Sequence, residues 1–198
     1  TEKIAVAKED AKPVGVTLFV IGDSKCIECF DVSPVVDFVK QGNVNITKEE
    51  MLEADSDAAA SLVEKYSLTK LPAIVVRSGD MEKLAFLSQG FEKKDDAYVF
   101  NNPLPPYVEA LTGNVKGKVE LVRINDSSCS ECSSVEPIVQ QLMFSGVHFS
   151  RQRNVDAGSD EGKSLIQKYK IKKLPTLVFS KELGDYDAIK PTWARLGT

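Results

Sequence analysis

The chain contains an internal duplication, and this feature constrains its fold more than any other. When the 198-residue sequence is shifted by 103 positions, residues 16–80 align with residues 119–183 without a gap, and about a third of the aligned pairs are identical. The identical pairs include both cysteines of a Cys-x-x-Cys motif. Because the period exceeds the roughly 20 to 50 residues of solenoid repeats, the two copies indicate tandem domains.

The boundary between the copies lies in a polar, glycine-containing stretch, residues 113–117, which is typical of a helix end and a short linker. We expect a first unit over residues 1–113, with the motif CIEC, and a second unit over residues 114–198, with the motif CSEC. The second unit ends sooner after its motif than the first. We therefore expect that its C-terminal helix is missing or that the chain is part of a longer protein.

Hydrophobic periodicity predicts the same α/β order in both copies. Runs of β-branched residues predict buried strands, and apolar residues at helical spacing after each motif predict a helix that begins beside the cysteines. The expected shared elements are a first strand (residues 16–21 and 119–124), that helix, a second strand (44–47 and 147–150), a second helix (58–66 and 162–169) and a third strand (73–77 and 176–180). Each unit is therefore expected to form a central mixed sheet flanked by helices.

The segments that follow the third strands differ between the copies. In the first copy, residues 83–88 and 97–100 are predicted to form antiparallel strands, and residues 103–111 a final helix. In the second copy, only a strand-like segment over residues 191–196 is expected.

Composition and charge exclude several classes of partner. No stretch approaches the roughly 18 consecutive apolar residues of a membrane span, so we expect no direct membrane insertion of this segment. The formal net charge is −4, divided as about −7 before residue 114 and +3 after it. A nucleic-acid-binding protein usually carries a stronger basic surface, so nucleic acid is not expected as a partner.

The four cysteines all belong to the two Cys-x-x-Cys pairs. A zinc ribbon places two such pairs about 15 to 20 residues apart, whereas these lie a whole domain apart. Each pair is therefore a separate candidate site. The one histidine, His148, has no counterpart in the first copy, where Asn45 stands. We therefore expect no metal site.

A redox role explains the presence of two such pairs. If each motif begins a helix, its first cysteine faces unsatisfied N–H groups and the positive end of the helix dipole, which favours the thiolate. Cys26 and Cys129 are then the expected exposed nucleophiles, and Cys29 and Cys132 resolve the mixed disulfide. The alternative is a static clip, but a disulfide closing so short a loop removes little entropy from the unfolded chain.

The spacing of cysteines and prolines resembles that of the thioredoxin family. In each copy a strand leads to Cys-x-x-Cys, a proline follows the second cysteine by five residues, and Lys-Leu-Pro precedes a later strand. The resemblance covers roughly residues 16–112 and 119–198. It implies a thioredoxin-like fold in each unit, with active-site helices kinked at Pro34 and Pro137.

The resemblance also implies a substrate-binding position in each unit. Leu71 and Leu174 are expected to offer backbone groups to an incoming substrate chain, next to cis peptide bonds at Pro72 and Pro175. A cis bond is found at only about 5% of X-Pro positions in folded proteins, so this expectation is specific. A tandem pair of such units also resembles protein disulfide oxidoreductases and disulfide isomerases.

Both copies depart from the family at positions near the cysteines. The family's tryptophan before the first cysteine is replaced by Lys25 and Ser128, and its buried acidic residue six positions before that cysteine by Val20 and Arg123. The resemblance therefore does not extend to that residue's assistance in proton transfer. We expect the two sites to differ in reduction potential.

These observations predict a thiol–disulfide oxidoreductase, with the choice between reductase and oxidase or isomerase left open. Its expected partners are protein thiols or disulfides and a further redox partner, and its only redox groups are the cysteine pairs, with no cofactor. The alternatives are a non-enzymatic interaction or redox-sensing module, and metal or iron–sulfur binding through thiolates shared by two molecules. We expect an extracytoplasmic soluble region of a membrane-anchored protein, with the cytoplasm as the alternative.

Overall fold

The computed structural model describes residues 12–191, and the chain divides into two units. The first unit comprises the chain up to Pro103 together with Tyr107–Val115, and the second comprises Leu104–Pro106 and the chain from Lys116 onward. Each unit is described by itself.

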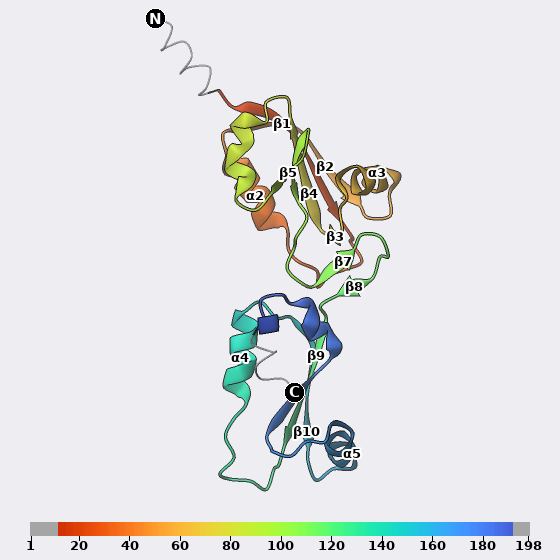
Figure 1. Ribbon diagram of the computed structural model, residues 1–198, viewed down its shortest axis with the longest axis vertical. Coiled ribbons are helices and arrows are strands. Elements are labelled where there is room, and N and C mark those ends of the chain that lie inside the picture. The colour runs from red at the N-terminus through yellow and green to blue at the C-terminus, as the bar shows by residue number, and fades with distance from the viewer. Residues whose placement is uncertain (1–11, 192–198) are drawn as a thin grey trace, which may run out of the picture. The chain divides into compact units, whose positions relative to one another are not determined.

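The first unit is built on a five-stranded mixed sheet with the strand order β2-β1-β4-β6-β5. Its strands and helices are β1 (Val14–Gly22), α2 (Ser33–Gln41), β2 (Val44–Glu53), α3 (Asp57–Tyr66), β4 (Ala73–Ser78), β5 (Glu92–Lys93) and β6 (Ala97–Phe100). β1 lies parallel to β2 and antiparallel to β4. The helices α2 and α3 lie on opposite sides of this sheet (Figure 1). Three short strands, β3 (Lys70–Leu71), β7 (Tyr107–Glu109) and β8 (Val115–Lys116), form a second sheet.

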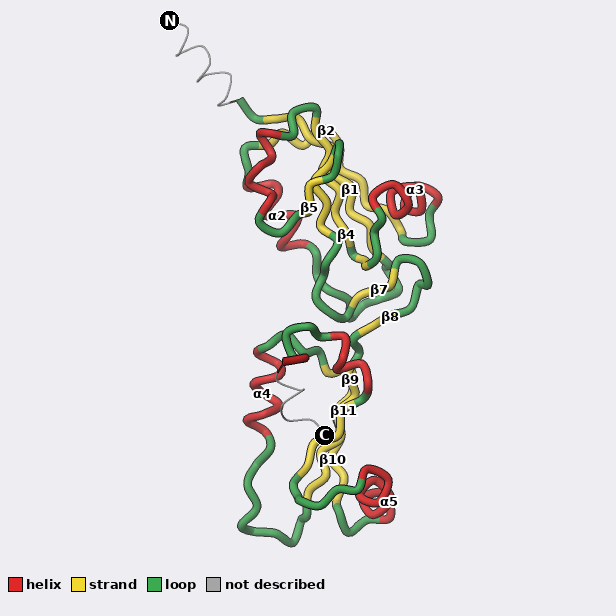
Figure 2. The backbone as a smooth tube through the Cα atoms, viewed as in Figure 1, coloured by secondary structure: helices red, strands yellow, loops and turns green. Residues whose placement is uncertain are grey.

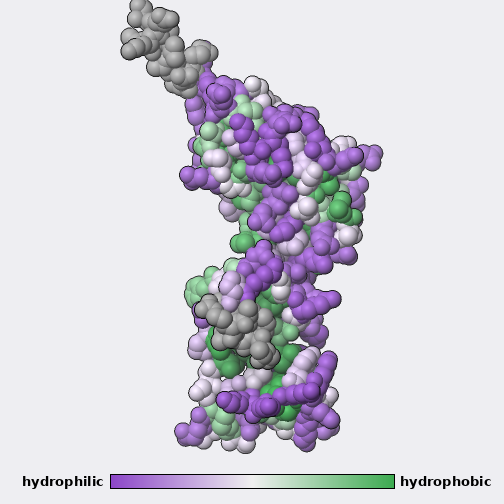
Figure 3. All heavy atoms as spheres, viewed as in Figure 1, coloured by the Kyte–Doolittle hydropathy of each residue, from purple (hydrophilic) through white to green (hydrophobic). Residues whose placement is uncertain are grey.

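The core of the first unit has two layers because successive side chains of a strand point to opposite faces of the sheet. On one face, Val16, Leu18 and Val20 of β1 pack with Val36 and Val39 of α2. The other face carries the α3 layer, whose buried members include Ile21, Ala59, Leu62, Tyr66, Ala73 and Val75. The end of β1 is therefore held by both layers, and the Cys26–Cys29 segment leaves the sheet from this fixed point. Outside this core, hydrophilic residues cover most of the visible face of the unit (Figure 3).

The second unit repeats this plan with fewer strands. Its elements are β9 (Val119–Asn125), α4 (Glu136–Phe144), β10 (Phe149–Asp156), α5 (Asp160–Tyr169), β11 (Thr176–Phe179) and the 3-10 helix η2 (Lys181–Asp185). β9 lies parallel to β10 and antiparallel to β11, so the order β10-β9-β11 reproduces β2-β1-β4. The helices α4 and α5 again lie on opposite sides of the sheet (Figure 1). The predicted α/β fold, with a mixed sheet flanked by helices in each unit, is confirmed.

The second helix of each unit begins and ends in the same way. The hydroxyl oxygens of Ser56 and Ser159 accept hydrogen bonds from backbone N–H groups in the first turns of α3 and α5. Ser67 and Lys170, with φ of 53° and 51°, end these helices in the left-handed conformation. These duplicated ends fix where the chain turns back toward Leu71 and Leu174.

Two sequence predictions for the first unit are wrong. Residues 83–88 form most of a 3-10 helix, η1 (Glu82–Ser88), instead of a strand, because Leu84 and Leu87 are spaced by three and are both buried. Residues 103–111 contain the strand β7 instead of a helix: prolines 103, 105 and 106 cannot donate helical hydrogen bonds, and the following residues pair with β3. Most of the strand predicted over residues 191–196 lies outside the described residues.

Candidate functional site

Each unit carries one disulfide, formed within its Cys-x-x-Cys motif. Cys26 and Cys29 are joined with a Cα–Cα distance of 5.3 Å, and Cys129 and Cys132 with a distance of 5.6 Å. The motifs occupy the loops that follow β1 and β9 (Figure 2). The structure thus places the four predicted catalytic cysteines at two equivalent positions.

The cysteines lie in turns and not at a helix N-terminus, which corrects the sequence prediction. The backbone N–H of Cys26 donates to the carbonyl of Asp23, and that of Cys29 donates to the carbonyl of Cys26. α2 begins only at Ser33 and α4 only at Glu136. Because the influence of a helix dipole fades within the first turn, it does not account for thiolate stability at either motif.

The prolines after the motifs start helices and do not kink them. Pro34 and Pro137 each occupy the second position of their helices, α2 and α4. In this first turn a proline removes no helical hydrogen bond, and its fixed φ suits the start of a helix. The kink implied by the family resemblance is therefore wrong for both units.

In each unit, two carboxylates accept backbone hydrogen bonds from the loop in front of the disulfide, and we call this pair the carboxylate bracket. In the first unit, Glu53 at the end of β2 accepts the backbone N–H of Ser24 at 3.1 Å, and Asp23 accepts that of Lys25 at 2.9 Å. The Lys25 ammonium itself contacts Asp55 at 3.1 Å. These bonds fix the chain direction just before Cys26.

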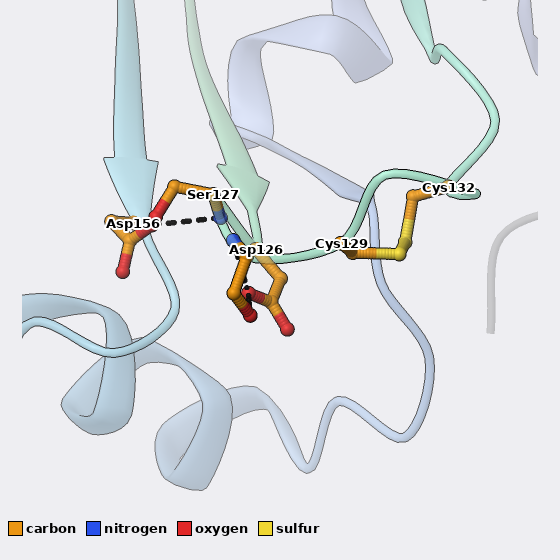
Figure 4. Close-up of a disulfide and its surroundings, with 6 residues drawn as sticks. Asp126, Ser127, Cys129, Cys132 and Asp156 are labelled. Atoms are coloured by element: carbon orange, nitrogen blue, oxygen red, sulfur yellow. Dashed lines mark hydrogen bonds between the residues drawn. A yellow bond between two sulfur atoms is a disulfide. The ribbon is translucent and has the colours of Figure 1, made fainter.

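The second unit repeats the bracket with matching residues. Asp156 at the end of β10 accepts the backbone N–H of Ser127 at 3.0 Å (Figure 4). Asp126 accepts the backbone N–H of Ser128 at 2.9 Å. The bonds from Ser127 lower the pKa of Asp156, and the bonds from Ser128 lower the pKa of Asp126. Both carboxylates are thereby kept ionised in front of Cys129.

Sequence reasoning missed the bracket residues Glu53 and Asp156. Their signal was present, because the two acids occupy the same place when the sequence is shifted by 103 positions. The predicted second strands, however, end before them.

The two cysteines of each motif differ in exposure, and the order is the reverse of the prediction. Cys26 is buried, with 8% of its surface exposed, whereas Cys29 is half-buried. Cys129 is half-buried and Cys132 is exposed. In the disulfide form the second cysteine of each pair is therefore the more accessible one.

The predicted substrate-binding positions of the two units have different surroundings. The Leu71–Pro72 and Leu174–Pro175 peptide bonds are both cis. Leu71 and Pro72 are buried, and Leu71 pairs with Val108 through the β3–β7 ladder. Leu174 and Pro175 are half-buried, and within residues 12–191 no strand pairs with Leu174. Contact of these four residues with a substrate stays a prediction.

The position of the family's buried acid is occupied differently in each unit. Val20 is buried in the α2 layer of the core. Arg123 approaches Glu136 with Nε–Oε2 at 3.2 Å and donates from its guanidinium to Gln152 at 2.8 Å. Neither side chain is an acid that exchanges a proton with a thiol.

A pocket of about 270 Å³ opens beside the first disulfide. It is lined by both cysteines and Pro72, by the apolar side chains of Phe30, Val32, Met51 and Leu52, by the carboxylates of Asp23, Asp31 and Glu53, and by Gly22 and Ser24. Sequence reasoning did not identify this pocket. Its walls come from the loop after β1, from the end of β2 and from Pro72 just before β4, so only the fold brings them together.

Two kinds of feature are absent from residues 12–191. No helix in this range is long and apolar enough to cross a membrane. Nor do three or more His, Cys, Asp or Glu side chains of this range come together in a group that could hold a metal ion.

No protein-family model matches the chain, and neither does any curated protein. Among solved structures, it is similar to a mutant of the alkylhydroperoxide reductase AhpF from Enterococcus faecalis, with 16% identity, a TM-score of 0.24 and 89% of each chain covered. The NTD_N/C domain of AhpF from the same organism matches with 13% identity, a TM-score of 0.25 and 89% of each chain covered. A protein disulfide oxidoreductase from Aeropyrum pernix matches with 16% identity and a TM-score of 0.23 over 91% of this chain and 84% of that one. Because every TM-score is below 0.5, no functional conclusion rests on these likenesses.

Proposed function

We propose that this protein is a thiol–disulfide oxidoreductase that exchanges disulfides with protein thiols at two sites, Cys26–Cys29 and Cys129–Cys132. The observation that carries the proposal is the equivalence of the two sites. Each pair is at disulfide distance, follows the first strand of a thioredoxin-like unit, and is held by the same carboxylate bracket.

The chemistry needs no group beyond the cysteines. In the reducing direction, one thiolate of a reduced pair attacks a sulfur of the substrate disulfide, which forms a mixed disulfide and releases one substrate thiolate. The other thiolate of the pair attacks its partner's sulfur in that mixed disulfide, which releases the second substrate thiolate and closes the pair's disulfide. Two electrons have passed to the substrate, and an external dithiol must then reduce the pair again. The reverse sequence oxidises a substrate dithiol.

Accessibility supports exchange at both sites. An attacking sulfur must approach along the disulfide bond, so at least one sulfur of the pair has to be reachable. Cys29 is half-buried and Cys132 is exposed. A purely structural role would stabilise the protein little, because each disulfide closes a loop too short to restrict the unfolded chain strongly.

The test is the reduction potential of each pair, measured separately. Cys26→Ser/Cys29→Ser and Cys129→Ser/Cys132→Ser variants of the full chain are equilibrated with glutathione mixtures, and the oxidised fraction is counted by mass spectrometry after alkylation. A value at or below about −250 mV indicates a reductase, and a value above about −180 mV indicates an oxidase or isomerase.

The same variants separate catalysis from binding. Reduction of insulin or refolding of a scrambled substrate is expected from each single-site variant and not from a variant without all four cysteines. A pair that does not exchange with glutathione would mark its unit as an interaction or sensing module, and failure of both pairs would refute the proposed function.

A further inference from the structure

The pocket beside Cys29 combines an apolar interior with an acidic edge. We call it the Phe30 pocket, defined by the twelve lining residues given above. Three of the twelve are carboxylates and none is basic. Small-molecule and side-chain sites commonly join apolar walls to a few charged groups in this way.

Two of its apolar walls differ in how firmly they are held. The ring of Phe30 is stacked on that of Phe100, with centroids 6.0 Å apart, and Phe91 packs on Phe100 in turn at 5.8 Å. Met51 is 74% exposed and projects from the edge strand β2. A pocket lined by both a fixed aromatic ring and a flexible thioether suits apolar side chains of somewhat different shape.

One carboxylate of the acidic edge, Asp31, is held in its charged form. The Asp31 carboxylate accepts the backbone N–H of Ser33 at 2.9 Å, and this bonding lowers the pKa of Asp31. Lys25, the nearest basic residue in sequence, has its ammonium on Asp55. The edge is therefore complementary to a cationic side chain.

The duplication supplies an internal comparison. At the positions that align with Phe30, Asp31 and Met51, the second unit has Ser133, Ser134 and Asn154. The bracket acids and the cysteines are kept, so what changes is the lining of the space beside the disulfide. The second unit therefore has small or polar residues at the positions of the two apolar walls, Phe30 and Met51.

We infer that the Phe30 pocket selects the substrate of the first site: an extended polypeptide whose reacting cysteine is next to a large apolar residue and is flanked by a basic residue. The apolar side chain enters between Phe30 and Met51, and the basic residue lies against Asp31 and Glu53. The second site, which has neither wall, shows no such preference. The inference rests on the proposed function, because selection is expressed through disulfide exchange at Cys26–Cys29.

The test uses the full chain with Cys129→Ser and Cys132→Ser, so that only the first site reacts. The substrates are short peptides with one cysteine in a mixed disulfide with thionitrobenzoate, whose release is followed by its colour. They differ only in the residue before the cysteine, Leu or Ser, and in the flanking residue, Lys or Glu. The reduced protein is expected to react about tenfold faster with Leu than with Ser peptides, because burial of a leucine side chain is worth roughly that factor. Lys peptides are expected to exceed Glu peptides, less so at high salt.

The decisive variant gives the first site the walls of the second. Phe30→Ser/Met51→Asn is expected to reduce the Leu preference to below about twofold. Met51→Asn alone changes a largely exposed side chain, so it keeps the test valid if the double variant does not fold, and it is expected to lower the preference at least about twofold. Phe144→Ser is the matched control, since Phe144 is 90% exposed on α4 and should leave the preference unchanged.

The outcomes separate this inference from the proposed function. If no peptide and no small disulfide such as hydroxyethyl disulfide reacts, the proposed function fails. If the protein reacts but shows equal rates for Leu and Ser peptides, or if the double variant keeps its preference, the pocket does not select substrates. The converse chain, with Cys26→Ser and Cys29→Ser, is expected to react without preference, and a tenfold preference there would also overturn the inference.

Discussion

Tyr66 and Tyr169 align in the duplication but are expected to differ strongly in their contribution to stability. Tyr66 is 3% exposed in the α3 layer of the core, whereas Tyr169 is 49% exposed. Truncation of a buried aromatic residue to alanine costs about 3–5 kcal/mol, so Tyr66→Ala should lower the unfolding free energy of the first unit by about 4 kcal/mol. Tyr169→Ala should cost the second unit about 1 kcal/mol or less.

The hydroxyl contributes only a part of the Tyr66 effect. It accepts a hydrogen bond from Arg77 Nε at 2.6 Å and donates one to Asp96 at 2.9 Å. The Arg77 and Asp96 side chains are 33% and 49% exposed, so water replaces much of what the hydroxyl provides. Tyr66→Phe should therefore cost about 1 kcal/mol.

Hydrogen exchange measured by mass spectrometry in urea assigns the loss to a unit, because peptides from β1 and β9 report on the two units separately. Equal losses for the two alanine variants would refute the reasoning from burial. A Tyr66→Phe variant as unstable as Tyr66→Ala would refute the division between ring and hydroxyl.

Three further predictions concern the sites and their support. In the reduced protein, Cys26→Ser should be alkylated by iodoacetamide severalfold faster than Cys29→Ser, because Cys29 is the more accessible cysteine, and the reverse order in a quenched time course would contradict this. Gly162→Ala should lower the stability of the second unit by about 1–3 kcal/mol despite the better helix propensity of alanine, because its Cβ would lie 2.1 Å from the Asp156 carbonyl oxygen; an unchanged thermal midpoint would contradict the clash. The bonds from Ser127 lower the pKa of Asp156, so the carboxylate's contribution to stability is present above the ordinary aspartate pKa and is lost as pH falls through the lowered value. The difference in unfolding free energy between the wild type and Asp156→Asn should then shrink on acidification, and a difference that does not change with pH would argue against the bracket.

The shared elements were predictable because their buried faces leave a regular pattern. The third strands, β4 and β11, and the second helices, α3 and α5, lie where apolar periodicity placed them. Each of these elements has neighbours that require a consistent set of apolar side chains. The pattern in the sequence and the packing in the structure therefore agree.

The second strands were predicted too short because β2 lies at an edge of its sheet. Its later residues include Lys48, Glu49 and Glu50, and charged side chains of this kind are tolerated where a strand has only one partner. No alternation of apolar residues marks this part of β2. Met51 and Glu53 lie on this part of β2. Because the sequence pattern did not predict this part of the strand, it predicted neither the pocket nor the carboxylate bracket.

The start of each first helix was misplaced for a local reason. Apolar spacing alone extends the helix back toward the cysteines, but Pro34 favours a helix that begins one residue earlier, and Asp31, which precedes the N-cap Val32, accepts the backbone N–H of Ser33. The family resemblance implies a kink at this proline, whereas its position in this chain indicates a helix start. Because the helix begins only after the cysteines, a helix dipole does not explain a reactive Cys26.

The duplication separates what holds the motif from what surrounds it. The bracket acids are kept as acids in both units, and the Cα–Cα distances within the motifs are 5.3 and 5.6 Å. The bracket bonds backbone N–H groups, so it fixes the loop whichever side chains follow the cysteines. The positions of Phe30 and Met51 are therefore free to change without loss of the disulfide geometry. A difference in function between the two sites is then expected in the substrates that each accepts, and the peptide preferences of the two single-site chains measure it directly.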